Sequence, residues 1–394
     1  MQVSVSKKDV SSKKRSVKSL RVYGFKMLLA CCTIMLTCPA YATEPVKIAA
    51  IFAKTGKAGL NNIPFIQVAE LSVAEINKQG GLLGKPVQLI FIDNKSTPIG
   101  AAIAADEAVQ QKVTAVVGAN WSSHSMAMAP ILKEAGIPMI TPTSTHPMIT
   151  PISDYIFRAC YTDAFQGKVM AQFAYRELGA RTAAVMKCFD QEYSMTLAKL
   201  FTESFKKSGG KLLFDGGYKS KAVDFKSILE KVKKLKPDVV FVPGYPRDSG
   251  LLVKQAASMG IKTTFLSGDG WSQIYKVAGD AVNGSYHATH WHPDVPLLAS
   301  VNFCETYKKK YGSDIPSHAA SVVYDAFMVL ADAIRRAGTT ADRSKIRDAL
   351  HATRGFQGIT GTLEFDANGD PKDKAVIVIK LEKGVSTYFK KIKP

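Results

Sequence analysis

The stretch that decides the fold lies between residues 46 and 140, and it begins with Val46-Lys47-Ile48-Ala49-Ala50-Ile51-Phe52. This mostly apolar run is typical of a strand that is buried on both faces of a sheet. A helical pattern follows at 64–78 and stops at Gly80-Gly81, because glycine favours the end of a helix. Further strands are predicted at 87–92, 115–118 and 139–140, with helices at 101–111 and 122–134. This alternation predicts a parallel sheet that is covered by helices on both faces.

The same alternation restarts in the second half of the chain. Helical and strand patterns alternate from residue 163 to residue 267, so a second parallel sheet is expected there. Two long helices at 296–311 and 316–337 follow, and a hairpin-like tail rich in Gly, Asp and Val ends the chain. The sequence therefore predicts an α/β protein with two doubly wound units in series. The length of 394 residues agrees, because single hydrophobic cores stop growing at about 250–300 residues.

The first 42 residues differ in composition from the remainder of the chain. A basic stretch that reaches Lys26 is followed by an apolar stretch from Met27 to Cys38 and by the small-x-small triplet Ala40-Tyr41-Ala42. This layout is typical of a secretory signal peptide, so we expect export and cleavage after Ala42. A lipoprotein cleavage site at Leu28-Leu29-Ala30-Cys31 is the alternative, but it would lie too early in the apolar stretch.

The net charge of +19 is weak support for a nucleic-acid partner. The leader holds eight Lys and Arg against one Asp, so 44 basic and 32 acidic residues remain after cleavage and the net charge falls to +12. No aromatic residues interleave the lysines of the predicted helix at 225–235, so no nucleic-acid binding is expected. Three cysteines also remain, at spacings that match no zinc motif, and they are interpreted as buried thiols.

Polar and aromatic residues follow several of the predicted strands, at the point where each strand ends. In an open parallel sheet these loops meet at one edge, and ligands bind there. The helix predicted to begin at Ser122 offers free backbone N–H groups and the positive end of its dipole to a carboxylate. Asp269 lies between Gly268 and Gly270 and suits an ammonium group. The residues expected to hold a small zwitterion are Trp121, Ser122, Ser123, Thr145, Tyr193, Tyr245, Asp269 and Trp271.

Other chemistries are less well supported, and neither a cofactor nor a metal is expected. The segment 80–85 fails as a phosphate loop because Pro86 stands where Ser or Thr should bind magnesium. His287, His290 and His292 lack a further ligand at a sensible spacing, so they are interpreted as solvated strand residues. Asp366 and Asp370 are interpreted as parts of a turn. The rival from another class is an exported enzyme that uses the Ser- and His-containing loops at 122–124 and 144–146, and it needs a base within hydrogen-bond reach of a nucleophile.

Three motifs identify a resemblance over residues 46–394. They are Gly80-Gly81-Leu82-Leu83-Gly84, Ile137-Pro138-Met139-Ile140-Thr141-Pro142 and Phe365-Asp366-Ala367-Asn368-Gly369-Asp370. With the export signal and the two α/β units, the chain resembles the leucine/isoleucine/valine-binding proteins, the type I periplasmic solute-binding components of ABC transporters. The resemblance implies a periplasmic monomer with two lobes joined by three crossover strands. It also implies that a branched-chain or other apolar amino acid binds in the interlobe cleft and is delivered to an inner-membrane permease.

The resemblance further implies lobe boundaries and residue roles. The first lobe would comprise 43–162 with 288–356, and the second 163–287 with 357–394. Ser122 and Thr145 stand where the family grips the α-carboxylate, and Asp269 stands where an acid, more commonly Glu, holds the α-ammonium. The remaining expected contacts are the backbone near Trp121 and Thr143, the adjacent Ser123 and Ser144, the aromatic residues Tyr193 and Tyr245, and Asn61 in the wall of the first lobe. A non-amino-acid ligand (an amide, urea or an aromatic acid) and a sensor role stay open as alternatives.

Overall fold

The structure is a computed structural model that describes residues 44–295 and 297–394. The predicted signal peptide and its cleavage site lie outside the described residues. No helix among the described residues is both long and apolar enough to cross a membrane.

The first sheet has five parallel strands in the order β2-β1-β3-β4-β5. They are β1 (Val46–Phe52), β2 (Val87–Asp93), β3 (Ala115–Gly118), β4 (Met139–Thr141) and β5 (Ile156–Arg158). The first four confirm the predicted strands to within one residue at each end. The sequence did not predict β5, because three residues are too few for a periodic pattern to be recognised.

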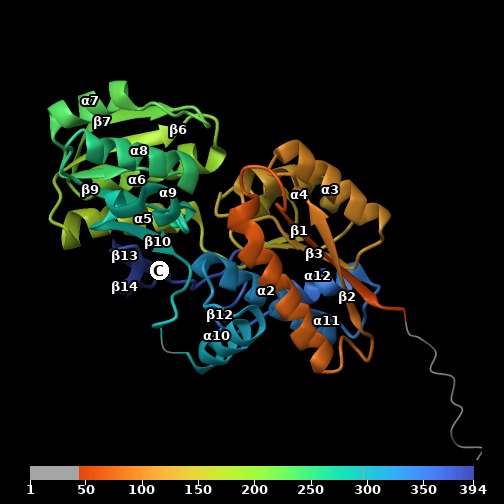
Figure 1. Ribbon diagram of the computed structural model, residues 1–394. Coiled ribbons are helices and arrows are strands. Elements are labelled where there is room, and N and C mark those ends of the chain that lie inside the picture. The colour runs from red at the N-terminus through yellow and green to blue at the C-terminus, as the bar shows by residue number, and fades with distance from the viewer. Residues whose placement is uncertain (1–43, 296) are drawn as a thin grey trace, which may run out of the picture. The chain divides into compact units, whose positions relative to one another are not determined.

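Helices cover both faces of this sheet, as the alternation predicts (Figure 1). Along β1, Ile48, Ala50 and Phe52 belong to one core, whereas Ala49 and Ile51 belong to the core on the opposite face. The first core is covered by α2 (Gly59–Lys78), α10 (Leu298–Tyr311), α11 (Ser321–Ala337) and α12 (Arg343–His351). The second is covered by α3 (Pro98–Gln110) and α4 (Ser122–Glu134).

The second sheet has seven strands in the order β14-β13-β10-β9-β8-β6-β7. Its parallel part contains β6 (Thr182–Cys188), β7 (Lys211–Tyr218), β8 (Val239–Phe241), β9 (Thr264–Ser267) and β10 (Ser285–Thr289). The predicted hairpin is confirmed as β13 (Val376–Glu382) and β14 (Val385–Ile392), which add to β10 in antiparallel fashion. One face is covered by α5 (Asp163–Gln172) and α6 (Glu192–Lys207), and the other by α7 (Lys226–Leu235) and α8 (Pro246–Ser258).

The chain passes between the two sheets three times. The passages lie between β5 and β6, between β10 and α10, and between β12 (Gly361–Leu363) and β13. Leu363 and Phe365 belong to the core of the first sheet, whereas Val376 begins β13 of the second. The lobe boundaries stay a prediction, and these contacts lead us to propose that the third passage lies after Phe365 rather than at residue 356.

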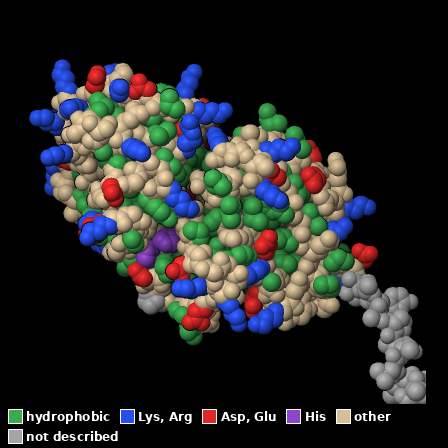
Figure 2. Space-filling view, viewed as in Figure 1, with side chains coloured by type: hydrophobic (Ala, Val, Ile, Leu, Met, Phe, Trp, Pro, Cys, Tyr) green, Lys and Arg blue, Asp and Glu red, His purple; other side chains and the backbone are tan. Residues whose placement is uncertain are grey.

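The lysines of α7 lie on the surface, and the three cysteines differ in burial. Lys231, Lys233 and Lys234 of α7 are exposed, and on the face drawn in Figure 2 the Lys and Arg side chains are scattered without forming a continuous band. Cys160, Cys188 and Cys304 are free, and the first two are buried as expected. Cys304 is only partly buried, so the interpretation as a buried thiol was wrong for that residue. Burial raises the pKa of the Cys160 thiol, so it stays protonated and inert.

The Phe365–Asp370 motif is confirmed as a turn, and its partly exposed Asp370 forms an ion pair with a buried arginine. The Oδ1 atom of Asp366 accepts hydrogen bonds from the backbone N–H groups of Asn368 and Asp370. The carboxylate of Asp370 pairs with the fully buried guanidinium of Arg158 in β5. The same guanidinium donates to the carbonyl oxygens of Ser144 and His146, each at 3.0 Å. The motif therefore holds the loop that follows β4, where candidate site residues lie.

Replacing Arg158 with Met should lower the free energy of unfolding by about 3 kcal/mol, because the largely buried Asp370 loses its charged partner and the carbonyl oxygens of Ser144 and His146 lose their donor. Arg158→Lys is the matched control and should lose less, since it keeps the charge but not the planar fork of donors. Urea unfolding of the three proteins measures the differences. A Met variant within about 0.5 kcal/mol of the parent would show that the pair does not stabilise the fold.

Candidate functional site

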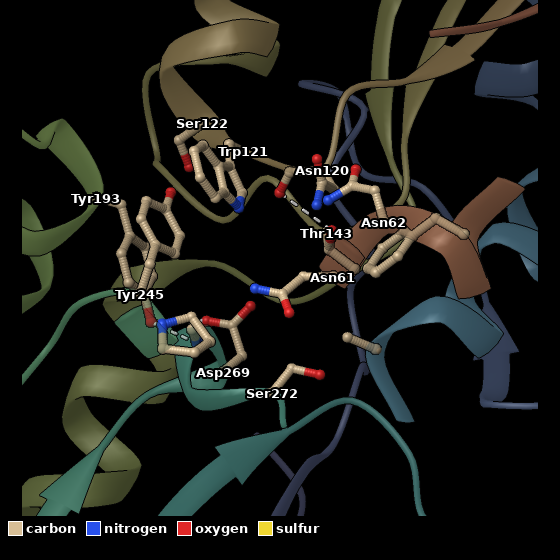
Figure 3. A pocket seen from close by; sticks show the side chains of 14 residues that line it. Asn61, Asn62, Asn120, Trp121, Ser122, Thr143, Tyr193, Tyr245, Asp269 and Ser272 are labelled. Atoms are coloured by element: carbon tan, nitrogen blue, oxygen red, sulfur yellow. Dashed lines mark hydrogen bonds between the residues drawn. The ribbon is translucent and has the colours of Figure 1, made fainter. Parts of the chain in front are cut away.

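A pocket lies where the loops after β3, β4, β8 and β9 come together with the first turns of α2 and α6 (Figure 3). Some of its lining residues follow strands of the first sheet, and others follow strands of the second sheet. They are Asn61, Asn62, Phe65, Asn120, Trp121, Ser122, Thr143, Tyr193, Tyr245, Pro246, Asp269, Gly270, Ser272 and Ala319. Seven of the ten residues expected from the sequence are among them: Asn61, Trp121, Ser122, Thr143, Tyr193, Tyr245 and Asp269.

Three aromatic rings stack along one side of the pocket. The rings of Trp121 and Tyr245 lie 4.2 Å apart between centroids at an angle of 12°. Tyr193 continues the stack, 5.4 Å from Tyr245 at 15°. Trp121 precedes α4, whereas Tyr245 precedes α8, so the stack joins the two halves of the pocket. It gives the pocket a large apolar wall.

Asp269 is the carboxylate of the pocket, and its oxygens are held by three donors. Its Oδ1 accepts from the hydroxyl of Tyr193 and from the amide of Gln166, each at 3.0 Å. Its Oδ2 lies 2.9 Å from the Nε2 atom of His290. Asp269 is 9% exposed, and a carboxylate offers about four acceptor positions. The side chain is therefore fixed in place and still has one position for a ligand.

The glycines on either side of Asp269 are required by close approach. A Cβ atom at Gly268 would lie 2.7 Å from both the Gln166 amide oxygen and the Tyr193 hydroxyl. A Cβ atom at Gly270 would lie 2.5 Å from the carbonyl oxygen of Gly244 and 2.9 Å from the Tyr193 ring. The Gly-Asp-Gly sequence therefore lets Gln166 and Tyr193 reach the carboxylate.

A second carboxyl group, Asp163, lies behind Asp269 and is fully buried. The amide nitrogen of Gln166 donates to Asp163 Oδ1 at 2.6 Å as well as to Asp269. Burial, together with the negative charge of Asp269, raises the pKa of Asp163 to about 7. Two carboxyl groups that share one donor cannot both ionise easily, and the fully buried Asp163 holds its proton up to a pH of about 7.

The first turn of α4 forms the side of the pocket opposite Asp269 (Figure 3). The helix begins at Ser122 as predicted, and no side chain caps it, so its first N–H groups have no partner within the helix. The Ser122 hydroxyl accepts from the backbone N–H of His146 at 3.3 Å, and the Thr143 hydroxyl donates to the carbonyl of Asn120 at 3.1 Å. This side presents donors and a positive helix end to an anion.

The other three expected residues do not line the pocket. The hydroxyl of Ser144 bonds to Ser125 at 2.8 Å and to the carbonyl of Ala119 at 3.0 Å, which is a structural role. Thr145 is buried beside Asp163, whose N–H donates to its carbonyl, and its own Oγ1 has no hydrogen-bond partner. Ser123 lies on α4 next to Ser122. Trp271 also lies away from the pocket and is buried in the core that α7 and α8 cover.

Sequence reasoning missed several residues that build the site. Gln166 and Asp163 lie in α5, where no sequence pattern indicated a binding role. The sequence pattern offered His290 only as a metal ligand. The interpretation of the three histidines as solvated was wrong, since His287, His290 and His292 are 3%, 1% and 4% exposed. Among the described residues no group of three or more His, Cys, Asp or Glu is arranged to hold a metal ion.

One histidine of the loops at 122–124 and 144–146, His146, is not placed to act as a base for Ser122. The Nδ1 atom of His146 accepts from the N–H of Met148 at 3.2 Å, so the proton of its ring lies on Nε2. That Nε2 donates to the hydroxyl of Thr196 at 2.9 Å. Both ring nitrogens are therefore occupied, and His146 cannot take a proton from Ser122 in this arrangement.

Comparison with known proteins agrees with this geometry. A family model described as "Periplasmic binding protein" matches residues 45–385. The chain is 30% identical over 339 residues to the leucine-, isoleucine-, valine-, threonine-, and alanine-binding protein of Pseudomonas aeruginosa, and the match covers 84% of this chain and 88% of that protein.

Two solved structures resemble the chain along nearly its whole described length. The leucine-binding protein LivK from Thermotoga maritima is 35% identical, with a TM-score of 0.84 and coverage of 89% of this chain and 99% of that one. The branched-chain amino acid transporter substrate-binding protein LivJ from Streptococcus pneumoniae, in complex with isoleucine, is 30% identical, with a TM-score of 0.84 and coverage of 89% and 100%. These matches confirm the predicted fold class of two doubly wound α/β lobes.

The raised pKa of Asp163 predicts a pH-dependent effect of the variant Asp163→Asn. Because the folded-state pKa of about 7 lies above the ordinary value of 3.8, the folded state binds the proton more tightly, and this group's contribution to stability falls as pH rises from about 4 to about 7. Asn keeps the acceptor for Gln166 and does not titrate. The variant should therefore gain stability relative to the parent as the pH rises, by on the order of a few kcal/mol at pH 8.

Urea unfolding of the parent and Asp163→Asn at pH 5 and pH 8, without added ligand, measures this difference. Asp280→Asn, which replaces an exposed acid of the same lobe, serves as the control and should show no such trend. An Asp163→Asn variant that differs from the parent equally at both pH values would contradict the assignment of the buried proton to Asp163.

Proposed function

The chain belongs to the periplasmic binding protein family, and we propose that it captures an α-amino acid with an apolar side chain and delivers it to the permease of an ABC transporter. Members of this family are binding proteins of transporters. The names of the similar proteins support amino-acid binding: the Pseudomonas relative is a leucine-, isoleucine-, valine-, threonine-, and alanine-binding protein, and the similar LivJ structure contains isoleucine.

The observation that carries this proposal is the pair of opposite electrostatic features that face one pocket. Asp269 supplies a fixed negative charge on one side, and the uncapped start of α4 at Ser122 supplies donors on the other (Figure 3). An α-amino acid carries an ammonium and a carboxylate on one carbon, which matches this arrangement. Hydrogen bonds to charged groups contribute about 1.5–3 kcal/mol each, enough for micromolar binding after the cost of ordering the ligand.

The apolar wall supports the choice of side chain. The stacked rings of Trp121, Tyr245 and Tyr193, with Phe65, border the pocket. Asp269 is the one carboxylic acid among the pocket-lining residues, and no Lys or Arg lines this pocket among the described residues. A charged side chain would therefore lose its hydration without gaining a partner, whereas an aliphatic or aromatic one gains buried contact.

The proposal includes the remaining expected contacts and the cellular context. Ser123, Ser144 and Thr145 are proposed to support the carboxylate side from their places on the first turn of α4 and in the loop after β4. We propose export to the periplasm with cleavage near Ala42, and action as a monomer with an inner-membrane permease. No cofactor is required for capture and release of a ligand.

Replacing Asp269 with Asn should weaken amino-acid binding by about tenfold to a hundredfold, because the ammonium loses its charged partner while the shape of the pocket is kept. Titration calorimetry with L-leucine, L-isoleucine, L-valine and L-phenylalanine measures the affinities of the parent and the variant. Asp280→Asn is the matched control and should bind as the parent does.

Benzoate, acetamide and urea complete the panel. Binding of benzoate or an amide by the parent, with no binding of any amino acid, would overturn the proposed ligand class. Unchanged amino-acid affinity in Asp269→Asn would overturn the role of that carboxylate.

The proposed export predicts the N-terminus of the mature protein. Intact-mass analysis of protein recovered from the periplasm of an expressing bacterium should show a chain that begins at Thr43. Ala42→Trp should block processing, because the cleavage site requires a small residue at this position, and the uncleaved chain should stay with the membrane fraction. A mature chain that begins at Cys31 and carries lipid would favour the lipoprotein alternative.

A further inference from the structure

His290 is in direct contact with the proposed ammonium acceptor, although it does not itself line the pocket. Its Nε2 atom lies 2.9 Å from Asp269 Oδ2, and its side chain is fully buried. The ring packs on Tyr161, with 4.2 Å between centroids, and this contact fixes its plane. Tyr161 lies on the passage after β5 and His290 on the passage after β10. The two passages thus meet beneath the carboxylate.

The surroundings of the ring determine where its proton lies. The Nδ1 atom of His290 is buried and has no hydrogen-bond partner. A proton on Nδ1 would be a buried donor without an acceptor, which is costly, whereas a proton on Nε2 is donated to Asp269. The geometry therefore fits the neutral ring with the proton on Nε2. A neutral His290 leaves the negative charge of Asp269 uncancelled, whereas a protonated ring would form a neutral pair with it.

We infer that His290 is a positioning residue that fixes Asp269 and preserves its charge, so that the pocket selects ligands that carry an ammonium group over those that lack one. This inference rests on the proposed function. Three donors reach the carboxylate, and Tyr193 and Gln166 both bond to Oδ1. His290 is the one described side chain that bonds to Oδ2. Without it the carboxylate can rotate about its bond to Cβ, and Oδ2 is no longer held in position for the ligand.

The test compares a variant that keeps the donor with one that removes it. Gln places an amide N–H at nearly the same distance along the side chain as Nε2 of His, and Met fills similar space without a donor. For the parent, His290→Gln and His290→Met, calorimetry measures the affinity for L-leucine, L-isoleucine, L-valine and L-phenylalanine. Each amino acid is paired with its deaminated analogue, the carboxylic acid in which hydrogen replaces the ammonium group.

A positioning role predicts a change in selectivity, not only in affinity. His290→Met should bind the amino acids about tenfold more weakly, while affinity for the deaminated acids changes by less than about twofold. His290→Gln should keep the selectivity of the parent to within about threefold. In ¹⁵N-labelled parent protein, the ring signals that disappear in His290→Gln should be those of a neutral imidazole protonated at Nε2.

Other outcomes overturn the inference in distinguishable ways. An equal loss of affinity for both members of each pair in His290→Met would assign His290 a purely structural role. Equal loss of selectivity in the Gln and Met variants would show that the donated hydrogen bond is not what matters. A doubly protonated ring at pH 7 would show that His290 does not preserve the charge of Asp269. A parent protein that binds none of the amino acids would overturn the proposed function itself, and this inference with it.

Discussion

A carboxylate buried beside aromatic rings is tolerated only when hydrogen-bond donors surround it, and the pocket is built around that requirement at Asp269. The donors come from α5, from α6 and from the passage after β10. Gly268 and Gly270 lack side chains because these donors approach too closely for a Cβ atom. The two glycines and the three donor side chains together keep one negative charge in a fixed place.

The same requirement explains the other buried charges near the site. Arg158 is buried, and its guanidinium is satisfied by Asp370 and by the carbonyl oxygens of Ser144 and His146. Asp163, in contrast, has one oxygen without a partner, and its pKa is raised to about 7 mainly by burial. Below a pH of about 7 a neutral Asp163 limits the repulsion of Asp269 and keeps the charge of the cluster near one unit. The fold thus concentrates the negative charge where a ligand can reach it.

The sequence was sufficient for the fold and for about half of the site. Strands such as Val46–Phe52 are buried on both faces and are recognisable from composition alone, and the start of α4 at Ser122 was predicted to the residue. Asp269 could be found because glycines flank it. Gln166 and His290 could not, since their roles depend on contacts across 103 and 21 residues of sequence. Thr145 and Ser144 follow the correct strand, but local hydrogen bonds and burial turn them away from the pocket.

The contacts that join the two halves of the pocket differ in strength from those that hold Asp269. The contacts between the halves include the Trp121–Tyr245 stack, the hydrogen bond from His146 to Thr196 and the hydrogen bond between the hydroxyls of Ser272 and Ser317. Each such contact stabilises the association of the two halves by about 1 kcal/mol. A ligand that forms several charge-assisted hydrogen bonds can therefore compensate for the loss of these contacts. The network around Asp269 involves Gln166, Tyr193 and His290, none of which lies in the loops that follow the strands of the first sheet. Separation of the aromatic stack would therefore leave the carboxylate oriented, and a ligand entering the pocket would meet an acceptor that is already in place.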